Sequence, residues 1–428
     1  QATTSFHREE SLLFSLTFRC SLLGLRRSYT ANMGIKGLMG FLHESAPKAI
    51  RTLKSQQAFT GRVIAIDASM CLYQFLIMIR ESGGAYNNLT NEEGEVTSHI
   101  VGMLSRTIRL MENGIKPVYV FDGKPPELKL NELRARRERR EKGEEEKEEI
   151  DKTEDADKIL KNAKLRTKVT REQNEDTKRL LRLMGVPVVE APSEAEATCA
   201  ALCRDGKVYA AATEDADCLT FGTSILLRNL MAVESQKKDI LEVSLSIALE
   251  QLNLTMDQFI DFCILSGCDY CDTVKGIGPA TAIKLLMTHG SLEKVLEHLG
   301  PEKVPANFPY KEAREFFKEC ESVPTSEIDF KFNEPDIEGL TKFLVEEKSF
   351  NKERVERFMQ RLQAVRSKGK QRPLDSFFTR AKVEVKDEDK FDPTKKKARA
   401  KLAAGKAAPG GAAKRKAPAA GGPAKRAR

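Results

Sequence analysis

Three features that mark common classes of protein are missing from this sequence. No apolar run reaches the roughly 18 residues that a membrane-spanning helix needs, so we expect no membrane partner. The nine cysteines are scattered, and Cys268 and Cys271 have neither a second pair nor a nearby histidine, which disfavours zinc and favours reduced thiols. No Ser/His/Asp or Cys/His arrangement points to a covalent nucleophile. The chemistry must therefore rest on other side chains.

Acidic residues are absent from the end of the chain, where residues 394–428 carry twelve Lys and Arg side chains. The whole chain has a net charge of +8, so residues 1–393 together carry −4. Any affinity of the folded part for nucleic acid must therefore come from separate basic patches. From residue 367 onward the composition turns to Lys, Ala, Gly and Pro without an apolar core, which predicts disorder.

Two acidic pairs, by contrast, stand out in the stretch 186–222. Each of two acidic pairs follows a short apolar run, and the second run, Val208–Ala212, is typical of a buried strand. We expect both pairs just past the carboxyl ends of strands, where open α/β sheets bind ligands. An alternative for the first pair is a capping box that begins with Ser193 and starts a helix. The pairs are Glu194 with Glu196 and Asp215 with Asp217.

Strand and helix patterns alternate along the rest of the chain. This alternation predicts an α/β fold with a mostly parallel central sheet and helical crossovers. Residues 306–366 contain a helical pattern that cannot be placed securely. The expected strands are Val63–Ile66, ending at Asp67, and Pro117–Phe121, ending at Asp122; the expected helices are Leu38–Ser45, Met70–Ile79, Thr97–Asn113, Asp257–Ser266 and Ala280–His289.

Residues 127–165 interrupt this alternation with a dense mixture of both charges. Helix-forming residues dominate and Pro is absent, but no apolar stripe exists that could dock a helix on a core. A solvated helix or a linker explains this composition. The alternative is a mobile helical gate over the site.

A glycine turn precedes the last of the expected helices. Gly276 and Gly278 flank Ile277, and a Gly-x-Gly turn that opens a helix presents free backbone N–H groups. Such a turn can bind a phosphate, although many helix turns look similar.

Seven acids stand out at or near the ends of the expected elements. A ligand set made only of oxygens selects hard cations such as Mg²⁺ or Mn²⁺, and Mg²⁺ usually also binds substrate phosphate. Two such ions can hold the attacking and leaving oxygens of a phosphodiester. Lys129 and Arg136 could stabilise charge developing on that phosphate, or could be two surface charges on a helix. The seven acids are Asp67, Asp122, Glu194, Glu196, Asp215, Asp217 and Asp269.

Several longer motifs resemble the flap endonuclease family of structure-specific 5′-nucleases. The resemblance runs from Met33 to about Phe378. Cys268 stands where many members have Ser. The motifs are Met33-Gly-Ile-Lys-Gly-Leu, Ala65-Ile-Asp-Ala-Ser69, Val118-Tyr-Val-Phe-Asp-Gly-Lys-Pro-Pro126, Ala191-Pro-Ser-Glu-Ala-Glu-Ala197, Ala212-Thr-Glu-Asp-Ala-Asp217, Cys268-Asp-Tyr270 and Gly276-Ile-Gly-Pro279.

The resemblance implies a PIN-like nuclease core, a helical arch and a helix–two-turn–helix element. It further implies that the seven acids bind two Mg²⁺ ions, for which Mn²⁺ can substitute, with Asp215 among the catalytic residues. Lys129 and Arg136 match the catalytic cations of the arch, and Tyr73 matches the aromatic residue that stacks on the base beside the scissile phosphate. A K⁺ ion is implied at the helix–two-turn–helix. The implied DNA contacts are Tyr73, Arg80, Arg106, Glu194, Gly267, Asp269, Gly276 and Gly278.

The tail contains a motif that resembles a box for binding the sliding clamp (PCNA). Its residues are Gln371, Leu374, Phe377 and Phe378, and the alternative is chance in a low-complexity tail. The basic clusters after Thr394 fit a nuclear localisation signal and sequence-independent attraction to DNA. We therefore expect a monomeric nuclear enzyme, up to one per clamp subunit, that binds 5′-flap DNA.

As a member of this family, the chain is expected to remove 5′ flaps in Okazaki fragment maturation and long-patch base excision repair, with an associated 5′→3′ exonuclease activity. The nearest alternative is a related 5′→3′ exonuclease, which usually carries a much longer region after the core. A clamp-bound scaffold without catalysis would lack metal ligands, and none is missing here.

Residues 1–32 have the composition of an organellar transit peptide, which would add a mitochondrial pool, or of upstream sequence translated ahead of Met33. We favour the second interpretation, because the family places the residue matching Gly34 close to the active site. The expected regions are a leader at 1–32, nuclease regions at 33–138 and 154–290 around a charged arch at 139–153, a helical part at 291–366 and the tail at 367–428.

Overall fold

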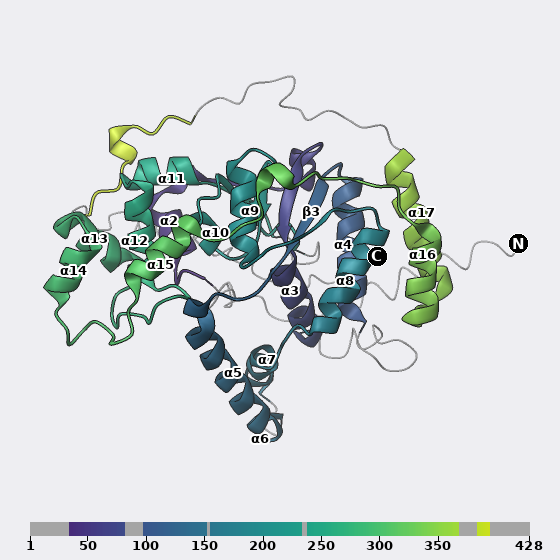
Figure 1. Cartoon of the computed structure of the whole chain (residues 1–428), viewed down its shortest axis with the longest axis horizontal. Helices are drawn as coiled ribbons and strands as arrows, with labels where there is room; N and C mark the ends of the chain where they lie inside the picture. Colours follow the sequence, from purple (N-terminus) through teal and green to yellow (C-terminus); the bar gives the residue numbers. More distant parts are fainter. Residues whose placement is uncertain (1–33, 82–96, 152–154, 233–237, 368–382, 394–428) are drawn as a thin grey trace, which may run out of the picture. The chain divides into compact units, whose positions relative to one another are not determined.

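A seven-stranded sheet with the order β1-β7-β6-β5-β2-β3-β4 lies at the centre of this computed structural model (Figure 1). The structure describes residues 34–81, 97–151, 155–232, 238–367 and 383–393. Five neighbouring strands are parallel, and β7 pairs antiparallel with β6 and β1, which confirms the predicted α/β fold with a mostly parallel sheet. The strands are β1 (Ile50–Leu53), β2 (Val63–Asp67), β3 (Lys116–Phe121), β4 (Val188–Glu190), β5 (Ala210–Ala212), β6 (Ile225–Arg228) and β7 (Ile240–Ser244).

The central strands are apolar along their length because helices cover both faces of the sheet. Side chains alternate between the faces of a strand, so Ile64 and Ile66 of β2 enter one core while Ala65 faces the other side. The first core contains residues of α3 (Ala68–Glu81), α4 (Ser98–Glu112), α8 (Arg171–Leu183), α16 (Ile337–Thr341) and α17 (Lys352–Ser367), and α9 (Ala195–Arg204) contacts β2, β3 and β5.

Helices after the sheet form the part of the molecule that contains the expected helix–two-turn–helix. Thr255 and Gln258 form a capping box that starts α12, and Gly267, with φ of 109°, ends it. Pro279 occupies the first turn of α13, where a missing N–H costs nothing. The helices, with α2 and α10 from earlier in the chain, are α2 (Leu38–Ser45), α10 (Asp217–Thr220), α11 (Leu245–Leu252), α12 (Met256–Ser266), α13 (Pro279–His289), α14 (Leu292–Leu299) and α15 (Tyr310–Glu319).

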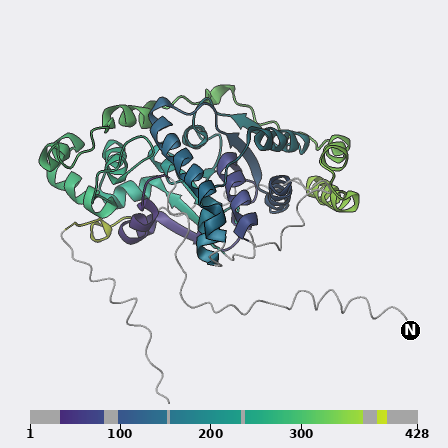
Figure 2. The ribbon, with the colours of Figure 1, turned by 90° about the horizontal axis from the view of Figure 1, so that it is seen from below.

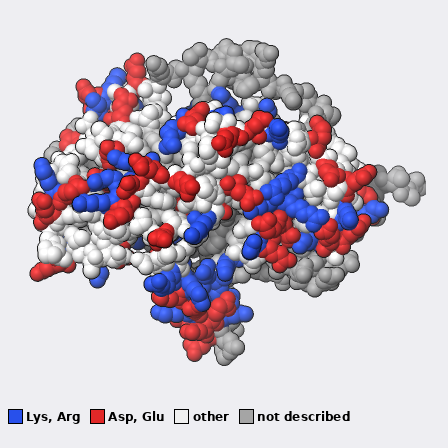
Figure 3. Space-filling model, in the orientation of Figure 1, with Lys and Arg blue, Asp and Glu red and all other residues white. Residues whose placement is uncertain are grey.

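Three charged helices project from the part that contains the sheet (Figure 1). They are α5 (Leu130–Glu145), α6 (Lys147–Asp151) and α7 (Ala156–Leu165), a longer stretch than the expected arch at 139–153. Figure 2 shows the long α5 in front when the molecule is seen from below. Figure 3 shows Lys and Arg gathered where these helices join the body and Asp and Glu toward their tip. We call these three helices, together with Lys129 at the N-cap of α5, the arch.

Every helix and strand predicted above is present, with ends shifted by a few residues at most. The expectation of disorder from residue 367 is wrong for residues 383–390. Lys48 Nζ donates to the Glu384 carbonyl at 3.0 Å and to Asp389 Oδ2 at 2.5 Å, which holds this segment on the core. In the described part of the chain, no helix combines the length and apolar character needed to cross a membrane.

Candidate active site

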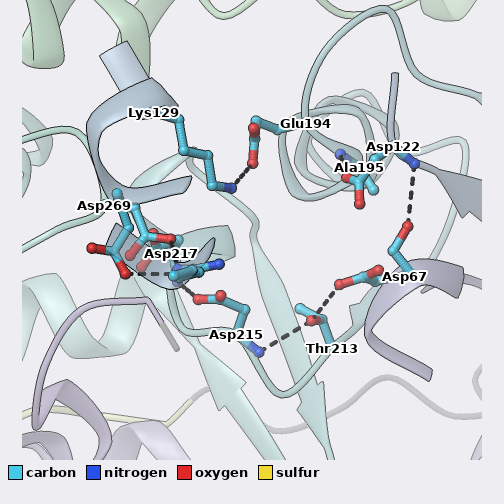
Figure 4. A network of polar contacts seen from close by, with 12 residues as sticks. Asp67, Asp122, Lys129, Glu194, Ala195, Thr213, Asp215, Asp217 and Asp269 are labelled. Carbon is cyan, nitrogen blue, oxygen red and sulfur yellow. Dashed lines mark hydrogen bonds and ion pairs between the residues drawn. The ribbon is translucent and has the colours of Figure 1, made fainter. Parts of the chain in front are cut away.

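Six of the seven acids lie just beyond the carboxyl ends of parallel strands. Asp67 ends β2 and Asp122 follows β3, so these two neighbouring strands deliver their acids to the same edge of the sheet. The two acidic pairs follow β4 and β5, and Asp269 follows α12. Figure 4 shows the arrangement of Asp67, Asp122, Glu194, Asp215, Asp217 and Asp269 around one site, with Lys129 reaching in from the arch.

Asp122, Glu194 and Glu196 form a set that could hold a metal ion. One oxygen from each of these carboxylates lies within 4.8 Å of the others. Glu196 Oε2 is buried and has no hydrogen-bond partner among the described residues, a costly condition unless a ligand satisfies it. An oxygen-only set of this kind fits Mg²⁺ or Mn²⁺.

Two of the other acids are oriented by donors of the protein. Asp67 accepts the Met70 N–H and the Thr213 hydroxyl, both at 2.9 Å. The same hydroxyl oxygen accepts the Asp215 N–H at 3.1 Å, and Asp215 Oδ1 accepts the Asp217 N–H at 2.9 Å. Thr213 therefore links the carboxylate at the end of β2 to the backbone of Asp215 after β5. Sequence reasoning missed it, because a threonine at a strand end carries no signal of its own.

The acids repel each other in a site from which water is largely excluded. Burial, together with the charge of Asp122, raises the pKa of Asp67 from 3.8 to about 7. Burial also raises the pKa of Glu196 well above its usual range, with Asp67 and Asp122 adding to the effect. Burial raises the pKa of Asp217 too, with the charges of Asp215 and Asp269 adding to the effect. Bound cations would offset this cost, so the electrostatics fit a metal centre.

Gly34 packs directly against two of these carboxylates. Its φ is +67°, and a Cβ atom added there would lie 1.8 Å from Asp215 Oδ1 and 2.5 Å from Asp217 Oδ1. The next residue, Ile35, donates its N–H to Asp217 Oδ1 at 2.6 Å. The expectation that Gly34 lies beside the active site is therefore confirmed. Residues 1–33 lie outside the described part of the chain.

The predicted capping box at the start of α9 is wrong. The N-cap residue is Glu194 rather than Ser193, and its side chain makes no capping bond. Asp122 instead accepts the Ala195 N–H at 2.9 Å, so an acid from the neighbouring strand satisfies the start of this helix. Glu194 is thereby left available for another partner.

That partner is a cation of the arch. Lys129 Nζ forms an ion pair with Glu194, and Arg136 Nη2 donates to Asp269 Oδ2 at 2.5 Å. Burial alone would lower the pKa of Lys129, but Glu196 and Glu194 raise it above its usual range, so this side chain stays charged. The structure therefore places both expected arch cations at the acid cluster.

The other residues expected to contact DNA are placed less uniformly. Arg106 is only 6% exposed, and its guanidinium carbon lies 3.7 Å from the Phe75 ring centroid, so it is held inside the protein. Tyr73 is partly buried on α3, and the side chain of Arg80 lies outside the described part of the chain. Gly267 has φ of 109° at the end of α12.

The glycine turn before α13 is open. A Cβ atom at Gly276 or Gly278 would meet nothing within 4 Å, and Gly276 has φ of +79°. The space beside both glycines would admit a phosphate, although the Ile277 N–H already donates to the Val274 carbonyl at 3.2 Å and the Thr281 N–H to the Gly278 carbonyl at 2.9 Å. The clamp-binding box, Gln371, Leu374, Phe377 and Phe378, lies outside the described residues.

Comparison with known proteins gives one consistent result. The XPG N-terminal domain matches residues 33–143 and the XPG I-region matches residues 185–269. Flap endonuclease 1 of Glycine max is 53% identical over 349 residues, covering 81% of this chain and 91% of the relative, and that of Danio rerio is 50% identical with the same coverage.

Solved structures agree with this result. Flap endonuclease-1 from Methanococcus jannaschii superposes with a TM-score of 0.58 at 37% identity, covering 74% of this chain and 96% of that one. The catalytic core of Rad2, at 24% identity and a TM-score of 0.58, shares the fold. From its motifs, its acid cluster and these relatives, the chain belongs to the flap endonuclease family of structure-specific 5′-nucleases.

Proposed function

We propose that this flap endonuclease hydrolyses DNA phosphodiesters at the acid cluster with two divalent ions. The observation that carries the proposal is the cluster itself, in which the buried Glu196 Oε2 lacks a hydrogen-bond partner among the described residues while two cations of the arch face the acids. The Rad2 core, which shares the fold, was solved in complex with DNA substrate. Membership of the flap endonuclease family supports 5′-flap DNA as the ligand of this chain.

Asp122, Glu194 and Glu196 would hold one ion, and the remaining acids would complete the site for a second. Bound Mg²⁺ would polarise the phosphodiester and supply a nucleophile from water near neutral pH. The remaining acids that we assign to metal binding are Asp67, Asp215, Asp217 and Asp269.

The chain's own cations have a separate task. Lys129 and Arg136 form ion pairs with carboxylates of the acid cluster. We expect both side chains to leave these partners and contact the phosphate when DNA binds. Fixed positive groups aimed at the developing charge lower the barrier without reorganising solvent. The open turn at Gly276 and Gly278 would bind the duplex backbone, with K⁺ beside it.

A labelled double-flap DNA tests this function against a nicked duplex of the same sequence. We expect Mg²⁺-dependent cleavage at the base of the 5′ flap, slower removal of nucleotides from the nick, and no cleavage in EDTA. Equal rates on the two substrates would contradict structure-specific recognition, and cleavage in EDTA would contradict the metal mechanism.

We further propose that the enzyme acts in Okazaki fragment maturation and long-patch base excision repair in the nucleus, bound to the sliding clamp. The support is the sequence of the box at residues 371–378 and the basic clusters that follow it. Replacing Phe377 and Phe378 with Ala should abolish clamp binding by calorimetry and leave clamp-free cleavage unchanged. Unaltered clamp affinity would show that the box is coincidental.

A further inference from the structure

Arg136 reaches the acid cluster from a helix that gives it no apolar support. Only Gly143 is buried among the residues of α5, so packing does not fix the long Arg136 side chain. A carboxylate one helical turn earlier does. Glu132 Oε1 accepts the Arg136 Nε–H at 3.0 Å, and Arg136 Nη2 then donates to Asp269 Oδ2 at 2.5 Å.

We propose that Glu132 is a positioning residue for the nuclease reaction, acting through Arg136. The inference rests on the proposed function, in which Arg136 transfers to the scissile phosphate. Holding Nε–H on Glu132 fixes the plane of the guanidinium and keeps its other donors directed at the site. Planar recognition of a phosphate by Arg depends on this orientation.

Glu132 is itself fixed from a second side. Its Oε1 atom also accepts the Arg139 Nη2–H at 2.9 Å, so one oxygen joins two arginines of the arch. Burial would raise the pKa of Glu132, but its bonds to Arg136 and Arg139 hold that pKa below the usual value. The carboxylate is therefore ionised wherever the enzyme would work.

The same helix supplies a matched control. Arg137 Nε donates to Glu141 Oε1 at 2.7 Å with the same four-residue spacing. The side chains of that pair are 74% and 55% exposed, whereas those of Arg136 and Glu132 are each 28% exposed. Both carboxylates support α5 as a helix, but Glu132 alone of the two touches an arginine that reaches the acid cluster. A role limited to helix stability would make the two equivalent.

The test measures single-turnover cleavage of flap DNA at saturating Mg²⁺, and DNA affinity in EDTA. We expect E132A to cleave about tenfold more slowly, as when an orienting partner of an active-site group is lost, with its DNA affinity in EDTA unchanged. E132Q keeps an oxygen that can accept the Nε–H and should recover most of the rate. E141A should match the unsubstituted protein in both measurements.

Double substitution separates positioning from a general structural effect. If Glu132 acts through Arg136, E132A/R136A should cleave no more slowly than R136A. A full-rate E132A, equal losses in E132A and E141A, or multiplied losses in the double variant would overturn the inference. If R136A is slow while E132A is not, this inference alone is wrong. If R136A itself keeps the full rate, the role of Arg136 in the proposed function is wrong as well.

Discussion

The acids of the site and its two cations, Lys129 and Arg136, are held by different kinds of structure. The acids follow buried parallel strands, and protein donors such as Thr213 and the Ile35 N–H fix their orientation. Of the two cations, Lys129 is the N-cap residue of α5 and Arg136 lies on α5, a helix with almost no buried residue, and both contact the acids through ion pairs. Ligands of a metal must be held in fixed positions by the surrounding structure. Cations that transfer to DNA instead need ion pairs that can break when DNA binds. We expect substitutions of the acids to cost more activity than substitutions of the cations.

The largest expected effect comes from the acids. Asp215→Ala should slow single-turnover cleavage about a thousandfold, because a metal contributes several kcal/mol to stabilising the transition state. Flap DNA binding should persist, since the duplex contacts lie elsewhere. Asp205→Ala, which removes an exposed acid at the other end of α9, is the control and should cleave normally. Near-normal cleavage by Asp215→Ala would contradict the metal assignment.

Substitution of Gly34 tests how rigidly the Asp215 and Asp217 carboxylates are held. Gly34→Ala places a methyl group where Asp215 Oδ1 now lies, so the carboxylates must shift. A displacement of about 1 Å at such a site costs about a hundredfold in rate. Gly40→Ala lies inside α2 with nothing within 4 Å of the added atom, so it should keep full activity and gain about 1 kcal/mol of stability. Equal rates for the two variants would show that Gly34 does not constrain the acids.

Crowded acids should destabilise the fold when no metal is bound. Since the pKa of Asp67 is raised from 3.8 to about 7, the folded state holds a proton that the unfolded state releases within this range. The free energy of unfolding in EDTA should therefore fall as the pH rises through that window. Asp67→Asn should flatten this dependence and stabilise the protein at pH 8 by a few kcal/mol, of order 1.4 kcal/mol for each pH unit of the shift. Urea titrations of both proteins at pH 5 and pH 8 measure this dependence. If the free energy of unfolding changes equally between these pH values in Asp67→Asn and in the unsubstituted protein, the electrostatic account is contradicted.

The smallest effect is expected on how firmly the arch is held against the acid cluster. Asp269→Asn removes the charged partner of Arg136 and should weaken the hold of α5 by about 1 kcal/mol. Trypsin should then cleave within residues 134–140 about fivefold faster, because local opening limits cleavage. Glu141→Gln changes an arch ion pair that does not reach the acids and should leave the digestion rate unchanged. Identical digestion of Asp269→Asn and the unsubstituted protein would mean that ion pairs do not hold the arch.

Much of the fold could be predicted from sequence because its central strands are short apolar runs that end in acids. β2 and β3 both follow this pattern. β1 and β7 are only four and five residues long and neither is a continuous apolar run. Their pairing with each other joins segments nearly 200 residues apart. Nothing local to either strand specifies that partner.

The residues of the site also divide into those that local sequence indicates and those that depend on contacts with distant residues. The acids that we propose as metal ligands could be predicted because residue type and position after a strand both point to them. Thr213 and Glu132 could not, since their importance depends on atoms brought from other elements. The start of α9 was mistaken for the same reason: its N–H partner is Asp122, 73 residues earlier, and not the nearby Ser193. Arg106 has the charge for binding DNA, but Phe75 buries it.

The most direct test of the central claim is a count of metal ions. Mn²⁺ bound to the protein in the presence of cleaved flap DNA can be measured by the loss of the free-ion signal in electron paramagnetic resonance. We expect two ions per chain, and fewer than two in Asp215→Ala at the same free Mn²⁺ concentration. A single ion in the unsubstituted protein, or an equal count in Asp215→Ala, would contradict a two-metal site built on the ends of these strands.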